Sequence, residues 1–287
     1  MLTHTLQMAD FPPPDSDDEN ESGEDMEEES EEEEAVPLTH EEHKAVGTEF
    51  YKKKDYRAAI ASYSSAIETF AAAAATEGAD AKTGAVYYSN RSAAYLMLFN
   101  YGAALEDCVA SLAMDPTNNK VINRKGKIHV VNGEFDEAEA AYQLVLSTDS
   151  TNAVAAVEVK AIPTLKNRVQ LAKDCLKKFE TNGMKIEGRQ AVSQLDIVLG
   201  LCPQYKEAKL IRCLALSASG RTDEAYSQTT SLMRSGMTNS SELLFVRAKC
   251  LYNMSQLDDA VKHLRQLLQR DPDHKAAFAE GERRARL

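Results

Sequence analysis

The stretch that decides the fold reads AVYYSNRSAAYLMLFNYGAALEDCVASLAMDPTN over residues 85–118 and NKVINRKGKIHVVNGEFDEAEAAYQLVLSTDSTN over residues 119–152. The two segments align without gaps at an offset of 34 residues, so that Ala104 meets Ala138. Bulky residues recur near the fourth position of each copy and small residues near the eighth and twentieth. A period of this length indicates one supersecondary unit used twice in succession.

The residue pattern within each copy is also informative. A bulky residue near position 4, small residues at 8 and 20, an aromatic or apolar residue at 24 and proline near 32 resemble the tetratricopeptide repeat. In that family each copy is a helical hairpin whose apolar face is buried only when a neighbour stacks on it. The resemblance therefore implies an all-α fold, a solenoid of stacked hairpins.

Six copies can be placed along the chain in two blocks, numbered within each copy from its first residue. About eleven extra residues near 71–84 interrupt the first block, and we expect them to extend a second helix to Thr76 and then form a loop. A covering helix is expected after residue 153, with Pro163 ending or kinking it. The copies cover residues 40–73, 85–118 and 119–152 in a first block of residues 39–171, and residues 172–205, 206–239 and 241–274 in a second block of residues 172–287 that ends in a further helix after Asp273.

Local signals support these boundaries. Thr39 followed by Glu42 is a capping box, which predicts the start of the first helix. Cys108, Cys213 and Cys250 fall at or beside inward positions of their hairpins, where they would act as small core hydrophobes. The five cysteines include no C-x-x-C pair, which favours a reducing compartment.

Charge divides the chain into a tail and a body. Residues 15–34 hold 14 acidic residues and no basic ones, whereas the chain from Thr39 onward carries a net charge of about +3. Self-repulsion and lack of apolar surface predict a disordered acidic tail over residues 1–38. The tail is a solvating segment, a kinase substrate or a competitor for acidic ligands. Three serines have an acidic residue three positions later, as acidophilic kinases prefer: Ser16, Ser22 and Ser30.

Several function classes lack support in the sequence. There is no Gly-rich phosphate loop, no H-E-x-x-H and no nucleophile elbow, so we expect no enzyme, cofactor or metal site. His40 and His43 have the spacing of two metal ligands, but no further ligand joins them. The slightly basic body and acidic tail argue against nucleic acid as a partner. No apolar run reaches the roughly 18 residues of a membrane span.

A strip of polar side chains carries the functional hypothesis. In stacked hairpins the first helix of each copy lines a groove, with positions 2, 5, 6 and 9 directed into it. In the first block these positions give Lys44, Asn90, Lys120 and Arg124. Lysine supplies a point charge, arginine a forked donor and asparagine an amide donor, a set that suits a ligand with two neighbouring carboxylates.

These residues resemble the carboxylate clamp of chaperone-binding tetratricopeptide domains. The family pattern places Lys and Asn on the first helix, Asn on the third and Lys-x-x-x-Arg on the fifth, and it implies binding of the Glu-Glu-Val-Asp tail of heat-shock chaperones. This chain matches at Lys44, Asn90, Lys120 and Arg124 but has Thr48 in place of the first asparagine. The implied partners are cytosolic chaperones of the seventy- and ninety-kilodalton classes.

The second block differs at the same positions, which are occupied by Leu176, Glu180, Ile211, Glu242 and Val246. This more apolar set suits a hydrophobic client segment or a spacer. From residue 39 on, the chain resembles the front of the tetratricopeptide co-chaperones that carry a J domain. The third clamp block and the His-Pro-Asp loop of that family are absent from this sequence, so we expect no stimulation of a chaperone ATPase.

The sequence therefore predicts a non-catalytic adaptor or co-chaperone in the cytoplasm, with the nucleus as an alternative location. The competing hypothesis is a general protein–protein interaction scaffold that assembles non-chaperone complexes through the same grooves.

Overall fold

The computed structural model describes residues 37–77, 80–237 and 240–274. The described residues from Leu38 onward belong to one compact unit. All regular structure in these ranges is helical. The predicted acidic tail with Ser16, Ser22 and Ser30, and the helix predicted after Asp273, lie outside the described residues.

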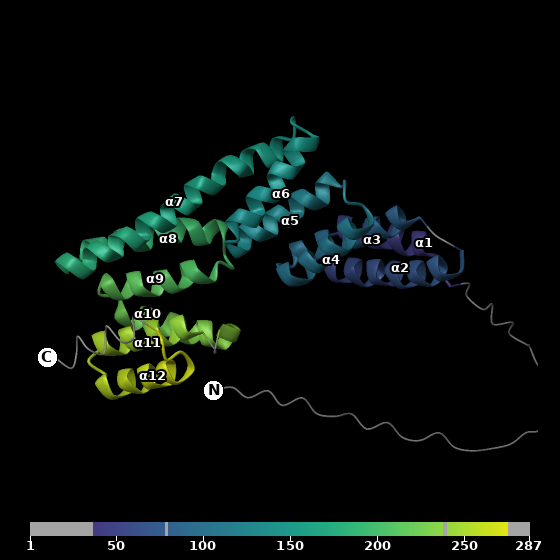
Figure 1. Cartoon of the computed structure of the whole chain (residues 1–287). Helices are drawn as coiled ribbons and strands as arrows, with labels where there is room; N and C mark the ends of the chain where they lie inside the picture. The colour runs from purple at the N-terminus through teal and green to yellow at the C-terminus, as the bar shows by residue number, and fades with distance from the viewer. Residues whose placement is uncertain (1–36, 78–79, 238–239, 275–287) are drawn as a thin grey trace, which may run out of the picture. The chain divides into compact units, whose positions relative to one another are not determined.

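Successive helices of the described part pack as hairpins (Figure 1). In the first block the helices are α1 (His40–Lys52), α2 (Tyr56–Glu77), α3 (Ala81–Met97), α4 (Tyr101–Met114), α5 (Asn119–Asn132) and α6 (Phe135–Thr148). They continue as α7 (Ala153–Asn182), α8 (Lys185–Leu201), α9 (Lys206–Ala218), α10 (Thr222–Leu232), a π-helical turn (Met233–Met237), α11 (Ser241–Asn253) and α12 (Leu257–Arg270).

Helix starts follow the repeat period. The predicted capping box is present, since the Thr39 hydroxyl accepts from the Glu42 amide and the Glu42 carboxylate accepts from the Thr39 amide. Asn118 and Asn152, the last residues of two successive copies, each accept a backbone N–H three residues later, at the starts of α5 and α7. Such caps satisfy amide donors that have no partner inside the helix.

The two helices of a hairpin approach closely where a glycine faces a tyrosine ring. A Cβ atom on Gly47 would lie 2.7 Å from the ring of Tyr63, and one on Gly126 would lie 2.9 Å from the ring of Tyr142. Both pairs join positions 8 and 24 of their copies. The small residues predicted at the interface are fully buried as well, as Ala59 shows.

The insertion in the first block is largely helical. Helix α2 runs to Glu77, one residue beyond the predicted Thr76. Helix α3 then begins at Ala81, one turn before the start of the second copy at residue 85. The extra residues therefore lengthen the helices on both sides of the connection.

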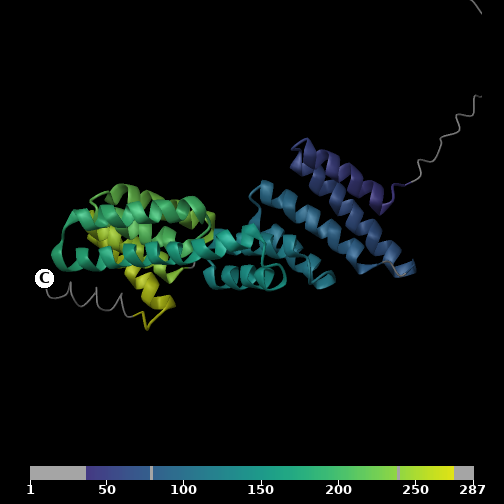
Figure 2. The same ribbon diagram turned by 90° about the horizontal axis from the view of Figure 1, so that it is seen from above.

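Helix α7 does not end at Pro163, although an end there is one of the two outcomes expected for this proline. The helix continues through this proline and spans 30 residues, so that it covers the third hairpin and also supplies the first helix of the fourth (Figure 2). Ile162, Leu165 and Val169 are buried on both sides of the proline, while Pro163 itself is exposed. Burial of these side chains outweighs the backbone hydrogen bond that proline removes.

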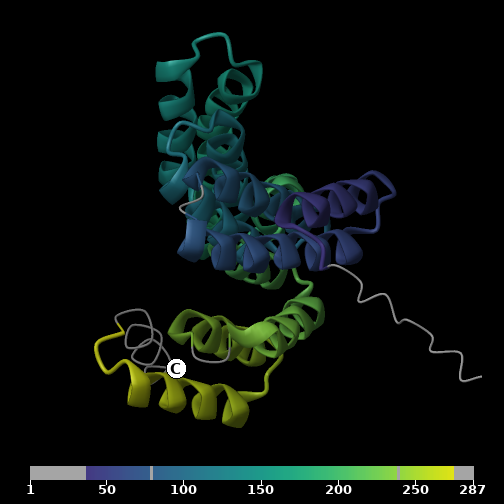
Figure 3. The same ribbon diagram turned by 90° about the vertical axis from the view of Figure 1, so that its right-hand side faces the viewer.

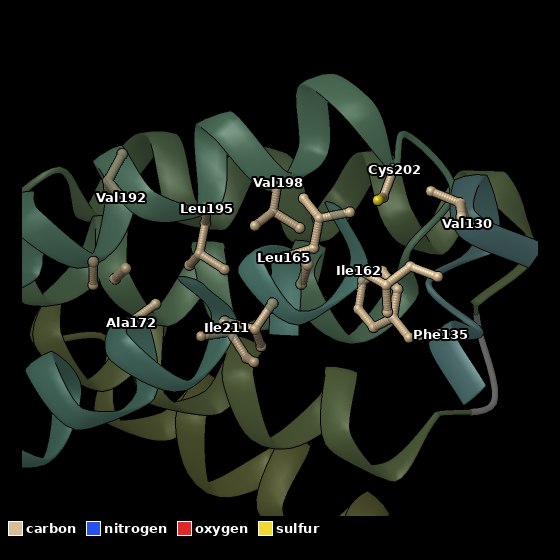
Figure 4. Packing of buried hydrophobic residues seen from close by; sticks show 14 of the residues in the cluster. Val130, Phe135, Ile162, Leu165, Ala172, Val192, Leu195, Val198, Cys202 and Ile211 are labelled. Carbon is tan, nitrogen blue, oxygen red and sulfur yellow. The ribbon is translucent and has the colours of Figure 1, made fainter. Parts of the chain in front are cut away.

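One hydrophobic core joins the two blocks. Figure 4 shows Val130 and Phe135 of the third hairpin close to Ile162 and Leu165 of α7. The same cluster continues through α8 and α9 to Cys250 on α11. The blocks therefore differ in repeat pattern and share a continuous apolar core. Figure 3 shows the last hairpin, α11 and α12 (yellow), below α1 and α2 (purple) and apart from them.

Arginines at position 7 of three copies tie the helices of their hairpins together. Each one donates to a side chain 16 residues later: Arg91 to Asp107, Arg212 to Gln228 and Arg247 to His263. The Arg91–Asp107 pair is bidentate and almost fully buried at the carboxylate. Planar guanidinium groups suit such fixed geometries.

A close contact between α8 and the end of α9 generates a stability prediction. A Cβ on Gly188 of α8 would lie 2.4 Å from the backbone nitrogen of Ser219, whereas one on Gly200 of the same helix would meet nothing within 4 Å. Gly188→Ala should lower the free energy of unfolding by about 1–3 kcal/mol through overpacking. Gly200→Ala should leave it unchanged or raise it by up to about 1 kcal/mol. Urea denaturation measures both, and equal effects of the two variants would contradict this packing.

The buried thiols generate a second prediction. All five cysteines are free and buried, and burial raises the pKa of the Cys202 and Cys250 thiols to about 11 and that of Cys213 to about 12. At pH 8 the reactive thiolate fraction of Cys202 should be about 100-fold lower than in the unfolded chain. Colorimetric thiol titration should show slow reaction before and fast reaction after denaturation. Fast labelling of the native chain would contradict the predicted low thiolate fraction of the buried cysteines.

Candidate functional site

The five residues predicted to bind carboxylates lie on the first helices of three successive hairpins. Lys44 and Thr48 are on α1, Asn90 is on α3, and Lys120 and Arg124 are on α5. We call these five residues the clamp strip. Helix α1 contacts α3, and a side chain of α5 bonds to α3, so the three helices are neighbours.

Arg124 is anchored by one edge of its guanidinium group. Its Nη1 donates to the Ser89 carbonyl oxygen at 2.8 Å and to the Ser92 Oγ at 2.8 Å. These bonds fix the guanidinium against α3, beside the residue that precedes Asn90. Its Nε and Nη2 atoms have no partner among the described residues. The edge that they form has the geometry for a bidentate bond to a carboxylate.

The polar groups of Asn90 and Lys120 have no partner among the described residues. Asn90 is half-buried and Lys120 is exposed. Neither side chain has a hydrogen bond or ion pair with any residue that the structure describes. An amide and an ammonium group are therefore available beside the anchored Arg124.

Thr48 does not offer its hydroxyl proton to a ligand. Its Oγ1 donates to the Lys44 carbonyl oxygen at 2.9 Å, within α1, and lies 3.3 Å from the Tyr63 hydroxyl. A hydroxyl that bonds back to the preceding turn is a common arrangement for threonine in a helix. The departure from asparagine thus removes a donor from the clamp strip.

Lys44 already has a partner that the sequence analysis missed. Its Nζ donates to Oε2 of Glu41, one turn earlier on α1. The other oxygen of this carboxylate accepts from the Tyr87 hydroxyl of α3 at 2.8 Å. The bond from Lys44, and next the bond from Tyr87, lower the pKa of Glu41. In the sequence, only the spacing of three residues between Glu41 and Lys44 indicates that the two side chains could pair on one helix.

In the second block the structure corrects part of the predicted groove. Ile211 and Val246 are buried in the array and do not line a surface. Leu176 and Glu180 line a small pocket of about 80 Å³ together with Lys249, and the Lys249 Nζ lies 3.1 Å from Glu180 Oε1. Lys249, at position 9 of the sixth copy, therefore adds a cation beside the more apolar set expected from the sequence.

Other kinds of site were also sought. The described residues contain no group of three or more His, Cys, Asp or Glu side chains that could hold a metal ion. His40 Nδ1 lies 2.7 Å from the Tyr87 hydroxyl, and no such bond joins it to His43. No helix in the described ranges is long and apolar enough to cross a membrane.

Comparison with protein families and curated sequences identifies related proteins. The model of the tetratricopeptide repeat family matches residues 242–274, which cover α11 and α12. A human relative, DnaJ homolog subfamily C member 7, is 30% identical over 237 residues, 83% of this chain and 44% of that protein. Heat shock protein STI1 of Saccharomyces cerevisiae is 35% identical over 120 residues, 42% of this chain and 19% of that protein. The chain thus spans less than half of either relative.

Solved structures agree on the fold. The crystal structure of the P58(IPK) TPR domain superposes with a TM-score of 0.59 at 18% identity, covering 84% of this chain and 63% of that one. At that identity the likeness establishes the arrangement of helices. The stacked hairpins, the 34-residue period and the family match to the last copy agree, and the chain folds as a solenoid of tetratricopeptide-type hairpins.

Proposed function

We propose that the chain is a non-catalytic cytoplasmic adaptor that binds the acidic C-terminal tails of heat-shock chaperones through the clamp strip. The proposal rests on the hydrogen bonding of the Arg124 guanidinium group. Its Nη1 is fixed on α3 while its Nε and Nη2 remain unpaired in the described structure. Asn90 and Lys120 stand unpaired beside it. These groups together can hold two carboxylates.

A peptide that ends in aspartate supplies such a ligand. Its main-chain and side-chain carboxylates are separated by only a few bonds, so each needs its own donor. The fork of Arg124 suits one carboxylate, and the amide of Asn90 with the ammonium of Lys120 suits the other. Charge-assisted bonds of this kind are about twice as strong as neutral ones.

The relatives support a chaperone partner. Two of the proteins matched by this chain are named as a DnaJ homologue and a heat shock protein. The match to the latter covers 120 residues of this chain. We assign the chaperones of the seventy- and ninety-kilodalton classes on the clamp resemblance. We confine the proposal to the first block, because Ile211 and Val246, two of the matching positions in the second block, are buried.

The first prediction concerns Arg124→Ala. A hydrogen bond to a charged group contributes about 1.5–3 kcal/mol, so the affinity for a peptide ending in Glu-Glu-Val-Asp should fall tenfold or more. Fluorescence anisotropy measures the affinity. Lys125→Ala removes the same charge from the neighbouring position of α5 and should change affinity little.

Two controls accompany this variant. Thermal unfolding must show that Arg124→Ala remains folded, because Arg124 also bonds to α3. An amidated peptide tests the terminal carboxylate directly and should bind much more weakly than the free acid. Equal binding of the two peptides would favour a general scaffold, and unchanged affinity of the arginine variant would overturn the clamp proposal.

A further prediction concerns Thr48→Asn. The hydroxyl of Thr48 bonds only within the α1–α2 hairpin, so its loss should cost little stability. A carboxamide there can reach toward the ligand and should strengthen binding by up to about 1.5–3 kcal/mol, with the lower value expected at a wet groove. Calorimetry with the same free-acid peptide checks this. If the variant binds no better, Thr48 lies outside the ligand's reach.

A further inference from the structure

Glu41 places a carboxylate where the proposed function requires the ligand's carboxylate. One of its oxygens accepts from the Lys44 ammonium, and the other accepts from the Tyr87 hydroxyl. Lys44 is the only cation of the clamp strip on α1, and Tyr87 precedes Asn90 by three residues on α3. The carboxylate therefore bridges α1 and α3 beside the proposed binding residues.

Tyr87 makes this bridge different from an ordinary surface ion pair. Exposed Lys–Glu pairs hold two long side chains loosely and contribute little. Tyr87, in contrast, is 0% exposed, and its ring packs against those of Phe70 and His40 at centroid distances of 5.7 and 5.8 Å. A rigid, buried hydroxyl thus fixes Glu41 in place.

His40 completes the anchor. Because the Tyr87 hydroxyl gives its single proton to Glu41, the Nδ1 atom of His40, 2.7 Å away, must donate to the Tyr87 oxygen. Three residues of α1 and one of α3 are joined in one chain of bonds: Lys44 to Glu41, Tyr87 to Glu41, and His40 to Tyr87. Both oxygens of the Glu41 carboxylate therefore accept a hydrogen bond.

We propose that Glu41 is a resident competitor that occupies Lys44 in the free protein and must be displaced by an incoming acidic tail. This inference rests on the proposed function of the clamp strip. Glu41 reduces the charge that the strip presents, since one of its three cations is neutralised. Beyond the two carboxylates held by Arg124 and by Asn90 with Lys120, a ligand must then bring a third carboxylate to replace Glu41 at Lys44. Glu41 therefore selects against peptides whose only carboxylates are those of the terminal residue.

The test compares two glutamates of the same helix. Glu41→Gln removes the competing charge, while Gln can still accept from Tyr87. Glu49→Gln is the matched control, because Glu49 also pairs with a lysine three residues later, Lys52, at 2.7 Å. Both variants raise the net charge by one. With a peptide ending in Glu-Glu-Val-Asp at low salt, Glu41→Gln should bind about three- to tenfold tighter, and Glu49→Gln should stay within about twofold of the wild type.

A second comparison uses Lys44→Ala as background. Without Lys44, Glu41 no longer blocks a cation, so adding Glu41→Gln should give no gain beyond that of Glu49→Gln in the same background. A peptide with neutral residues before its C-terminus should also gain less from Glu41→Gln than the acidic peptide does.

The outcomes separate the two proposals. If Arg124→Ala weakens binding but Glu41→Gln behaves like Glu49→Gln, the competitor inference fails and the clamp proposal stands. If neither Arg124→Ala nor Glu41→Gln changes the affinity, both fail together. Tighter binding by Glu41→Gln that persists without Lys44 would also overturn the competitor role, since the gain would then arise from general charge.

Discussion

The array depends on the close approach of the two helices within a hairpin, and in the first and third hairpins a glycine on the first helix faces a tyrosine ring on the second. Gly47 under Tyr63 and Gly126 under Tyr142 leave no room for a Cβ atom. This contact sets how closely two helices of a hairpin approach, and neighbouring hairpins can stack only on that fixed shape. Helices α1, α3 and α5, the first helices of three successive hairpins, carry the clamp strip.

Arginine side chains add hydrogen bonds between helices to this apolar packing. Arg91 and Arg247 are used within the array, where each forms several hydrogen bonds and a contact with a tyrosine ring. Arg124 differs because only its Nη1 is used, to fix α5 against α3. The same side chain can therefore be part of the stack and still present donors to a ligand. Pre-positioned donors lower the entropy cost of binding.

The positive charge of the clamp strip is partly neutralised within the protein. Three cations on one strip would attract many anions, and Glu41 neutralises one of them from a position fixed by a buried tyrosine. In the competitor proposal, Glu41 lowers the affinity for all acidic peptides but lowers it most for those with few carboxylates. The clamp strip therefore discriminates between peptides by their negative charge. Thr48, whose hydroxyl donates to the Lys44 carbonyl oxygen, also lowers the number of donors in the clamp strip.

The sequence by itself determined the helical hairpins, their 34-residue period, the caps and the helices that carry the clamp strip. These follow from local backbone geometry and from which residues recur at 3.6-residue spacing. Only the tertiary structure decided that α7 continues through Pro163, that Ile211 and Val246 are buried, and that Glu41 occupies Lys44. Each of these depends on neighbours distant in sequence, such as Tyr87, which lies 46 residues from Glu41. Periodicity identifies the face of a helix, but packing selects the partner of each side chain.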